Sequence, residues 1–191
     1  MKNVIVLGSI NMDIVAVTKR HPKVGETVIG SDLHYFPGGK GANQAVSSSK
    51  LGGQTTIIGM VGSDAFGSQL IKFLESEGVK NQIKTISGIP TGTALITVSS
   101  ESSDNTIVVV PGANFQLTEK DVDKIKIDEG DILVCQFETS LEVILAFFKK
   151  GKKVGTINIL NPAPAQLIPI DLLKLVDVLI INETELEIIS D

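Results

Sequence analysis

Apolar runs of strand length recur along the chain, and they constrain its fold more than any other feature of the sequence. They lie at residues 4–7, 56–60, 132–135, 155–160 and 178–181. None of these runs alternates apolar with polar residues, so both faces of each strand are expected to be buried. Strands buried on both faces are typical of a parallel sheet.

Segments with helical patterns fall between these strands. They lie at residues 43–51, 65–77, 118–125, 140–149 and 169–175. The segment 65–77, for example, begins after Ser63 and Asp64, either of which is a suitable N-cap. Strands and helices that alternate in this way predict an α/β domain with a doubly wound, mostly parallel sheet. With 191 residues, of which 42% are hydrophobic, the chain has the size of one domain.

Two segments, residues 13–36 and 93–111, break this rhythm because they are rich in Val, Ile and Thr and alternate. The second is expected to form a hairpin of residues 93–98 and 106–110. Together the two segments predict a small four-stranded sheet, separate from the main one. Nothing obvious covers the second face of this sheet, so we expect it to act as a lid, a dimer contact or both.

The composition argues against several classes of function. The net charge is -5, and the 17 basic residues are scattered and include a single arginine, so a nucleic-acid-binding face is not expected. Cys135 is the only cysteine and lies in an apolar run, which indicates a small buried side chain. His21 and His34 share no metal-ligand spacing. The absence of a signal peptide and of an apolar stretch of transmembrane length predicts a soluble, cytoplasmic protein without a membrane partner.

A glycine-rich run, residues 36–44, precedes one of the predicted helices. Glycines let the backbone approach a ligand closely, and the helix that follows directs its N-terminal amides toward it. The run is not a Walker A loop, because Gly41 and not Ser or Thr follows Lys40, and it is not a G-x-G-x-x-G fingerprint. A ligand the size of a sugar is the better interpretation.

Polar side chains follow several of the predicted strands, where open α/β sheets bind ligands. Asn11 and Asp13 follow the first strand and point the same way on an extended chain, so they could bind neighbouring sugar hydroxyls; an Asx turn is the alternative. Glu138 follows the third, where it could instead stabilise a helix N-terminus. Asn182 and Glu185 follow the fifth and read either as a capping box or as a pair that faces phosphate and hydrated magnesium.

These motifs together resemble the ribokinase-type (PfkB) sugar kinases over the whole chain. The resemblance rests on residues 8–13, 38–46, 161–165 and 182–185, in this order. It implies ATP-dependent transfer of phosphate to the primary hydroxyl of a small sugar, with D-ribose converted to ribose 5-phosphate as the favoured reaction. The residues it implies for sugar binding are Asn11, Met12, Asp13, Gly39, Lys40, Gly41, Ala42, Asn43 and Glu138.

The resemblance also implies cofactors and partners. Asn182 would contact the nucleotide phosphate, and Glu185 would organise Mg²⁺ through water. ATP, Mg²⁺ and, in the intact family fold, a monovalent cation are the implied cofactors, and a homodimer through the lid is expected for the intact protein. The lid itself would close over the sugar and exclude water.

One signature of the family does not occur in these 191 residues. It is an Asp-Thr-x-Gly-Ala-Gly-Asp stretch, whose last Asp is the catalytic base and whose glycines form an anion hole. We therefore expect residues 1–191 to be the N-terminal part of one ribokinase-like α/β domain, with lid segments at about 13–36 and 93–111 and the C-terminal part of the fold absent. The catalytic base is expected beyond Asp191, and the chain alone is expected to be inactive and unstable.

Other functions remain open from the sequence. The chain could be a truncated, non-catalytic module that binds sugar, or part of a kinase for a related sugar or a nucleoside. Aromatic residues make up 4% of the chain, which favours a pentose over a nucleoside that would need aromatic stacking. A Rossmann dehydrogenase is disfavoured because its glycine fingerprint is missing.

Overall fold

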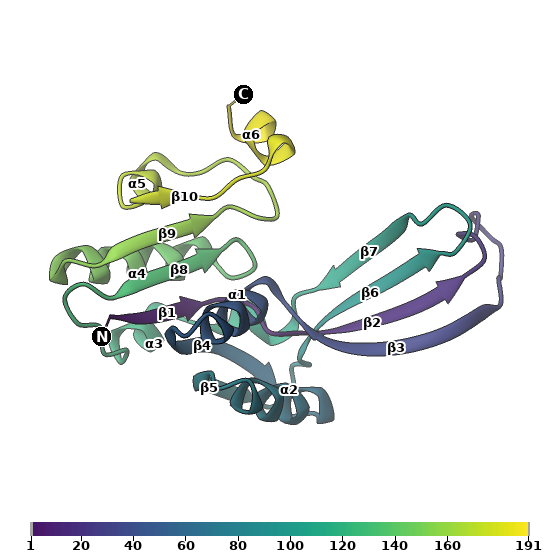
Figure 1. The fold of residues 1–191 in the computed structure, drawn as a ribbon, viewed down its shortest axis with the longest axis horizontal. Coiled ribbons are helices and arrows are strands. Elements are labelled where there is room, and N and C mark those ends of the chain that lie inside the picture. The colour runs from purple at the N-terminus through teal and green to yellow at the C-terminus, as the bar shows by residue number, and fades with distance from the viewer. Residues whose placement is uncertain (1, 191) are drawn as a thin grey trace.

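The protein is built around a parallel sheet of six strands. A computed structural model describes residues 2–190 and places the strands in the order β10-β9-β8-β1-β4-β5 (Figure 1). Their bounds are β1 Asn3–Leu7, β4 Gln54–Gly62, β5 Lys80–Ile86, β8 Ile132–Gln136, β9 Ile157–Asn161 and β10 Val178–Leu179. Each neighbouring pair is parallel. The order of strands runs outward in both directions from β1, as in a doubly wound sheet.

Helices bury both faces of this sheet. Their bounds are α1 Lys40–Lys50, α2 Ala65–Ser76, α3 Glu119–Asp123, α4 Leu141–Val154, α5 Ile170–Leu173 and α6 Glu183–Ser190, with a 3-10 helix, η1, at Gly112–Gln116. Along β1, Val6 packs with residues of α1 and α2, whereas Leu7 packs with residues of α4 on the opposite face. Because successive side chains of a strand point to opposite faces, this double burial explains why the strands read as continuous apolar runs.

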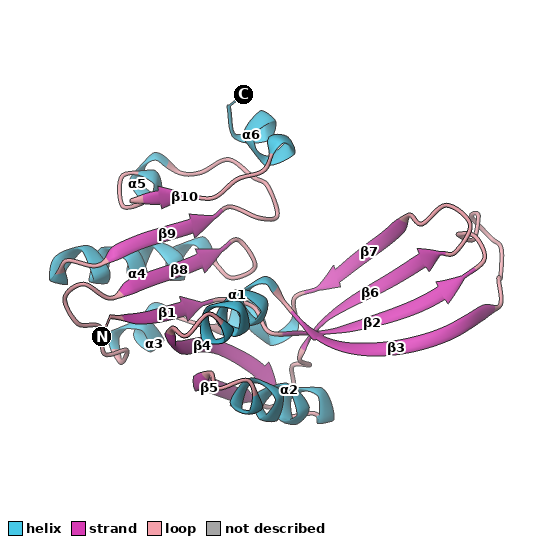
Figure 2. Cartoon of the chain, viewed as in Figure 1, coloured by secondary structure: helices cyan, strands magenta, loops and turns pink. Residues whose placement is uncertain are grey.

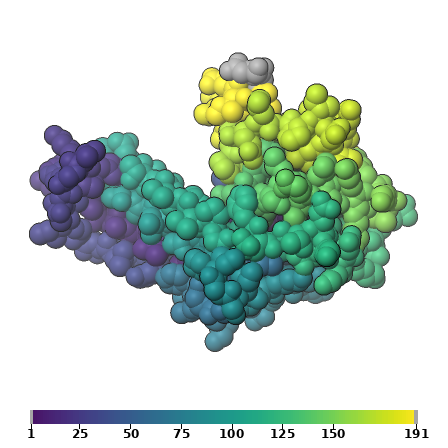
Figure 3. Space-filling view, turned by 180° about the vertical axis from the view of Figure 1, so that it is seen from behind, coloured from purple at the N-terminus to yellow at the C-terminus, as the bar shows by residue number. Residues whose placement is uncertain are grey.

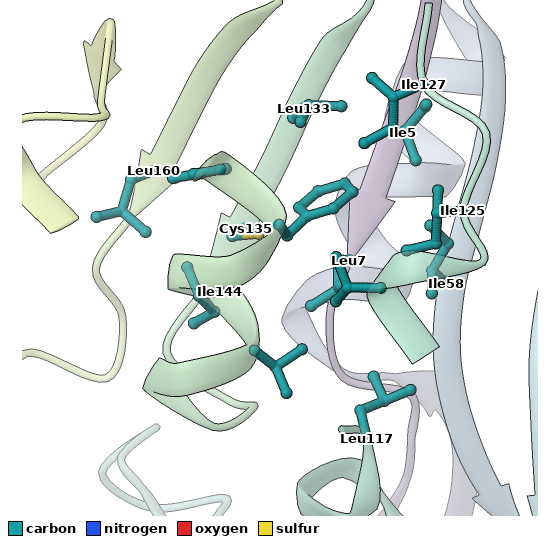
Figure 4. Packing of buried hydrophobic residues seen from close by; sticks show 14 of the residues in the cluster. Ile5, Leu7, Ile58, Leu117, Ile125, Ile127, Leu133, Cys135, Ile144 and Leu160 are labelled. Carbon is teal, nitrogen blue, oxygen red and sulfur yellow. The ribbon is translucent and has the colours of Figure 1, made fainter. Parts of the chain in front are cut away.

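The larger of the two cores lies between the sheet and α4 (Figure 4). Ile144 of α4 lies beside Cys135 of β8 and Leu160 of β9, and all three side chains are fully buried. Burial strongly raises the pKa of the Cys135 thiol, which therefore stays neutral. Cys135 is thus a small core residue, as its position in the sequence predicted.

A second sheet of four strands extends away from the first (Figure 2). Its order is β3-β2-β6-β7, with bounds β2 Asn11–Thr18, β3 Gly30–Gly38, β6 Gly92–Ser99 and β7 Asn105–Val110. β2 pairs in parallel with β6, and the two edge strands pair antiparallel to them. We refer to this sheet as the lid. Its existence and strand content confirm the four-stranded sheet predicted from the alternating segments.

Asp64 joins the lid to the main sheet. Its carboxylate is the N-cap of α2, where it accepts a hydrogen bond from the Gly67 amide at 2.8 Å. The same carboxylate accepts bonds from the amide and the hydroxyl of Thr91, at 2.8 and 2.6 Å. Because Thr91 directly precedes β6, the cap of α2 also fixes the point at which the lid begins.

The predicted strands are confirmed, and two elements were missed. β5 is the edge strand of the main sheet, and its partly exposed residues Lys80–Ile86 carry too many polar side chains to stand out as apolar. η1 is a short turn after the lid. The helix predicted at residues 43–51 begins at Lys40 instead, directly after Gly39. No helix within residues 2–190 is both long and apolar enough to cross a membrane.

Candidate functional site: a polar cavity beneath the lid

A cavity of about 490 Å³ lies where the carboxyl ends of the main strands meet the root of the lid. From behind, the molecule is hollowed between the lid and the C-terminal residues (Figure 3). The polar side chains on the cavity are those of Asn11, Asp13, Lys40, Asn43, Asn114, Glu138 and Glu185. Its apolar lining comes from Ala94, Ile96, Ile107, Val109, Pro111, Phe115, Phe137, Ala163 and Pro164, and Gly39 completes it.

Asn11 and Asp13 reach the cavity from the first residues of β2. The sequence placed both residues after the first strand and began the lid at about residue 13. β1 ends at Leu7, and the lid strand β2 begins two residues earlier than predicted, so that it includes Asn11 as well. Being two apart on a strand, they share one face, and both line the cavity. Met12 lies between them, faces the opposite side and is fully buried in the core with Ala42. The structure therefore does not place the Met12 side chain at the cavity.

A buried asparagine that the sequence did not single out holds Asn11 in place. The Asn114 Nδ2 donates to the Asn11 Oδ1 at 2.7 Å, and the amide of Ile10 donates to the Asn114 Oδ1 at 2.9 Å. Asn114 belongs to η1, directly after the last lid strand. The bond thus connects the beginning of the lid with its end.

Asp13 carries its carboxylate in an unfavourable environment. Burial raises its pKa above the ordinary 3.8, and the nearby charge of Glu138 raises it further. Room for this carboxylate depends on Gly38, where a Cβ atom would overlap with it. Two carboxylates that face one cavity can both accept hydrogen bonds from donors such as hydroxyl groups.

Glu138 is held by the glycine turn from the other side. Its Oε2 accepts a hydrogen bond from the Lys40 amide at 3.1 Å and a short one from the Ser9 hydroxyl. The Ser9 Oγ in turn accepts from the Gly41 amide at 3.3 Å. These amides belong to the first turn of α1, whose N-terminal end favours negative charge. Ser9 is the second site residue that the sequence did not single out.

The glycines of the turn bring α1 against the end of β1. Gly39 has φ of 90°, and a Cβ there would lie 2.8 Å from the Asn11 nitrogen. A Cβ at Gly41 would lie 2.6 Å from the Ser9 nitrogen. Both positions therefore require glycine. Gly41 and Ala42 are buried, whereas Lys40 and Asn43 line the cavity with Gly39.

A row of side-chain amides connects α1 with the more C-terminal strands. Gln44 accepts a bond from the Gln136 Nε2 and donates to the Asn161 Oδ1 at 3.3 Å. The Asn161 Nδ2 donates to the Ile180 carbonyl at 2.9 Å. Asn161 opens the segment 161–165, in which the Ala163–Pro164 peptide bond is cis and both residues line the cavity. This segment thereby forms the wall opposite the lid.

Glu185 lies at the outer end of the cavity and binds Asn182, which precedes α6. The Asn182 amide donates to the Glu185 Oε2 at 3.0 Å, and the Glu185 amide donates to the Asn182 Oδ1 at 2.7 Å. This is a capping box at the start of α6. Glu185 lines the cavity, whereas Asn182 does not. The capping interpretation is thus correct for the structure, and it leaves a role toward phosphate as a prediction.

Residues 1–191 match the model of the pfkB family carbohydrate kinases. The chain belongs to this family. It is 41% identical to ribokinase of Haemophilus influenzae over 99% of its own length and 62% of the relative's. It is 35% identical to deoxyribokinase of Salmonella typhi, over 98% and 62% of the two chains. The chain therefore spans about 60% of the length of these carbohydrate kinases.

Solved structures of ribokinases share the fold. The structure of Arabidopsis thaliana ribokinase complexed with ribose and ATP matches with a TM-score of 0.86 and 31% identity, over 100% of this chain and 63% of the other. Ribokinase of Thermotoga maritima matches with a TM-score of 0.88 and 35% identity, over 98% and 61%. The ribokinase-like fold expected from the sequence is therefore confirmed for this chain.

Within this carbohydrate kinase fold, the described residues offer little to a metal ion. No group of three or more His, Cys, Asp or Glu side chains within residues 2–190 could hold one. Mg²⁺ commonly keeps several waters and uses one or two carboxylates together with substrate phosphates. Glu185, which is alone at its end of the cavity, fits that kind of indirect contact and not a protein cage.

Proposed function

We propose that this chain forms the sugar-binding portion of an ATP-dependent carbohydrate kinase that converts D-ribose to ribose 5-phosphate. One observation carries the proposal: two carboxylates, of Asp13 and Glu138, face a cavity beneath the lid together with donor side chains. The identity to ribokinases supports the choice of sugar. Family membership alone supports only a carbohydrate kinase.

The polar groups of the cavity suit a small polyhydroxylated ligand. Asp13 and Glu138 would accept hydrogen bonds from sugar hydroxyls, and Lys40 and Asn43 would donate to them. Gly39 would bring backbone close to the sugar ring. Gly41 and Ala42, which are buried, would contribute only by shaping the turn, and Met12 would contribute only by packing in the core with Ala42. Apolar lid residues such as Ile96 and Val109 would exclude water once the sugar is bound.

The nucleotide would approach from the side of α6. There Asn182 would contact phosphate, and Glu185 would hold the water shell of Mg²⁺, which would neutralise charge on the phosphates. A monovalent cation is proposed for the intact family fold alone. Cavity-lining carboxylates in the described part of the chain are those of Asp13, Glu138 and Glu185. Because the first two would hold sugar hydroxyls, we expect the 191-residue chain to bind sugar without transferring phosphate.

The lid offers a surface for a second copy. Tyr35, Leu95 and Val108 share the face that points away from the cavity, and their side chains are about half exposed. Apolar strand faces of this kind are commonly covered by another chain. We propose a homodimer through the lid, which sedimentation of the protein before and after Val108→Lys would test.

A nucleoside is the second candidate ligand. Phe115 and Phe137 line the same cavity, and an aromatic ring could stack on a base. The low aromatic content of the whole chain argued against a nucleoside, but two of its aromatic rings lie at this cavity. Ribose and nucleoside are distinguished by direct binding.

Calorimetry with D-ribose, 2-deoxy-D-ribose and adenosine tests the proposal. We expect D-ribose to bind the 191-residue chain with the highest affinity and to give no ribose 5-phosphate in the presence of ATP and Mg²⁺. Tighter binding of adenosine would favour the nucleoside. Binding of none of the three would overturn the proposed function, and turnover by this chain would overturn the assigned roles of Asp13 and Glu138.

A further inference from the structure

We propose that Asn114 is a positioning residue that fixes the amide orientation of Asn11, so that the cavity presents one defined donor beside the acceptor Asp13. The site would thereby select a ligand hydroxyl that accepts a hydrogen bond from Asn11 and donates one to Asp13. This inference rests on the proposed function for the identity of the ligand. Its structural part, the orientation of the two asparagines, does not depend on the ligand.

The orientation of the Asn114 side chain is set by the backbone N–H of Ile10, which can only donate a hydrogen bond. The Ile10 nitrogen lies 2.9 Å from the Asn114 side chain, so the atom facing it must be the acceptor, Oδ1. Asn114 is 2% exposed, and its side chain therefore cannot exchange this bond for one to solvent. The Nδ2 of Asn114 must then point to the other side.

The orientation of the Asn114 amide in turn fixes that of Asn11. The Asn114 Nδ2 lies 2.7 Å from the Asn11 side chain, and since an amide nitrogen only donates, Asn11 must present its Oδ1. The Nδ2 of Asn11 is consequently turned elsewhere. Within residues 2–190 it has no hydrogen-bond partner, and Asn11 is among the residues that line the cavity. The free donor of Asn11 is thus available to a ligand.

The packing around the pair leaves little freedom. Gly92 is the register partner of Asn11, and a Cβ at Gly92 would overlap with both the Asn11 Oδ1 and the Asn114 Nδ2. The pair therefore lies directly against the backbone of β6. Asn11 itself is 3% exposed, so its amide is held on several sides.

The fixed donor gives the cavity a defined polarity. Asp13, two residues farther along the same face of β2, is acceptor-only when ionised. A hydroxyl between the two would satisfy both, because it accepts one hydrogen bond and donates another. A carbonyl or ether oxygen could accept from Asn11 but could not donate to Asp13. If the Asn11 amide were free to rotate, it could bind a ligand group that donates as well as one that accepts. Asn114 would in this way make the site specific for a polyol.

Asn114→Asp tests the idea with almost no change in size. The new carboxylate can still accept from the Ile10 amide but cannot donate to Asn11, so the Asn11 amide should rotate and present its oxygen to the cavity. We expect D-ribose affinity to fall roughly tenfold or more, in line with the loss of a hydrogen bond at a buried polar site. Asn105→Asp, at the exposed start of β7, adds the same charge away from the cavity and should leave ribose affinity unchanged.

Discrimination between sugars separates positioning from a general loss of structure. Wild type should bind D-ribose more tightly than the one of 2-deoxy-D-ribose and 3-deoxy-D-ribose that lacks the hydroxyl facing Asn11. In Asn114→Asp this ratio should shrink toward one, whereas a merely weakened fold would lower all affinities by the same factor. An unchanged ratio would overturn the proposal. Asn11→Asp keeps the acceptor for Asn114 and removes the donor, so it should compress the ratio even if Asn114→Asp fails to fold.

Side-chain amide exchange by nuclear magnetic resonance supplies a readout without sugar. In the wild type the Asn11 Nδ2 protons should exchange faster than those of the Asn114 Nδ2, because only the latter are hydrogen-bonded within the protein. In Asn114→Asp the Asn11 protons should become protected, because they would bind the new carboxylate. Slower exchange at the Asn11 Nδ2 than at the Asn114 Nδ2 in the wild type would overturn the proposal. If wild type binds none of the sugars, the proposed function fails while this measurement still decides the orientation.

Discussion

The two ends of the cavity hold their polar side chains in opposite ways. Beneath the lid, the bonds that fix Asn11 and Glu138 join residues 98 to 129 positions apart in the sequence. At the other end, Asn182 is exposed and Glu185 is half-buried, and the two residues bind each other across three positions. The first arrangement exists only in the folded chain, whereas the second is a helix cap that α6 could form by itself.

This difference indicates which end is prepared for a ligand. Under the lid the donors and acceptors are already oriented, and Asp13 keeps a carboxylate that burial makes unfavourable. A buried charge that lowers the stability of the folded protein is typical of functional sites. The Asn182 and Glu185 pair satisfies itself, so binding of phosphate there would have to compete with the cap.

The largest effect is expected where the lid end is most crowded, at Gly39. Gly39→Ala combines a φ of 90° with a Cβ 2.8 Å from the Asn11 and Ser9 backbone. We expect the free energy of unfolding to fall by about 3–4 kcal/mol and ribose binding to be lost. Gly52→Ala is the matched control, because Gly52 has φ of 88° and nothing within 4 Å, and it should cost about 1–2 kcal/mol with ribose binding retained. Equal destabilisation by both, measured by chemical denaturation, would contradict the crowding.

Asp13→Asn should weaken ribose binding and stabilise the fold at neutral pH. A charged acceptor contributes roughly 10- to 100-fold in affinity, which calorimetry would measure. Because the pKa of Asp13 is raised in the folded protein, its stabilising contribution is fully present below the unfolded pKa and is lost as the pH rises through the folded value. The difference in melting temperature between variant and wild type should therefore grow from acidic to neutral pH.

Protonation of the Asp13 carboxyl should also change the affinity for ribose. Ribose affinity of the wild type should decrease as the pH falls through the raised pKa of Asp13, because the protonated carboxyl loses acceptor capacity. A difference in melting temperature that is constant with pH would show that the Asp13 carboxyl is not perturbed by folding.

Ser9→Ala probes the support of Glu138 with a smaller change. It removes the hydroxyl that donates to Glu138 and accepts from the buried Gly41 amide, and we expect a loss of about 1–3 kcal/mol in stability. Ribose affinity should fall roughly tenfold, because Glu138 keeps its bond from the Lys40 amide. Ser76→Ala, an exposed serine that bonds only within α2, should change neither quantity. Unaltered ribose affinity in Ser9→Ala would show that the Lys40 amide alone positions Glu138.

The smallest effect is expected at the other end of the cavity. Asn182→Ala removes the N-cap of α6 and should destabilise that helix by about 1 kcal/mol, seen as faster amide exchange within Glu183–Ser190. Asn182→Ser, which retains a capping oxygen, should largely restore protection. Ribose affinity should be the same in all three proteins. A loss of ribose affinity in Asn182→Ala would mean that the two ends are coupled.

Much of the fold could be predicted because burial leaves a local pattern. Residues 4–7 and 132–135 are apolar throughout since both faces of their strands are covered, whereas the edge strands of the lid are largely exposed. β5 carries no such pattern, because it is an edge strand with many exposed side chains, and it was missed. Residues such as Asn11, Asp13 and Glu138 were found from motifs and lie on one cavity, while their roles toward sugar stay predictions.

The sequence by itself determined the parallel sheet, the separate lid and the glycine turn, because each depends on residue types within a few positions of one another. Only the tertiary structure decided that Ser9 supports Glu138 and that Asn114 orients Asn11. Serine and asparagine are common in turns, and nothing nearby in the sequence distinguishes these two. Their importance arises from burial beside a distant polar partner, where an unmade hydrogen bond cannot be replaced by water.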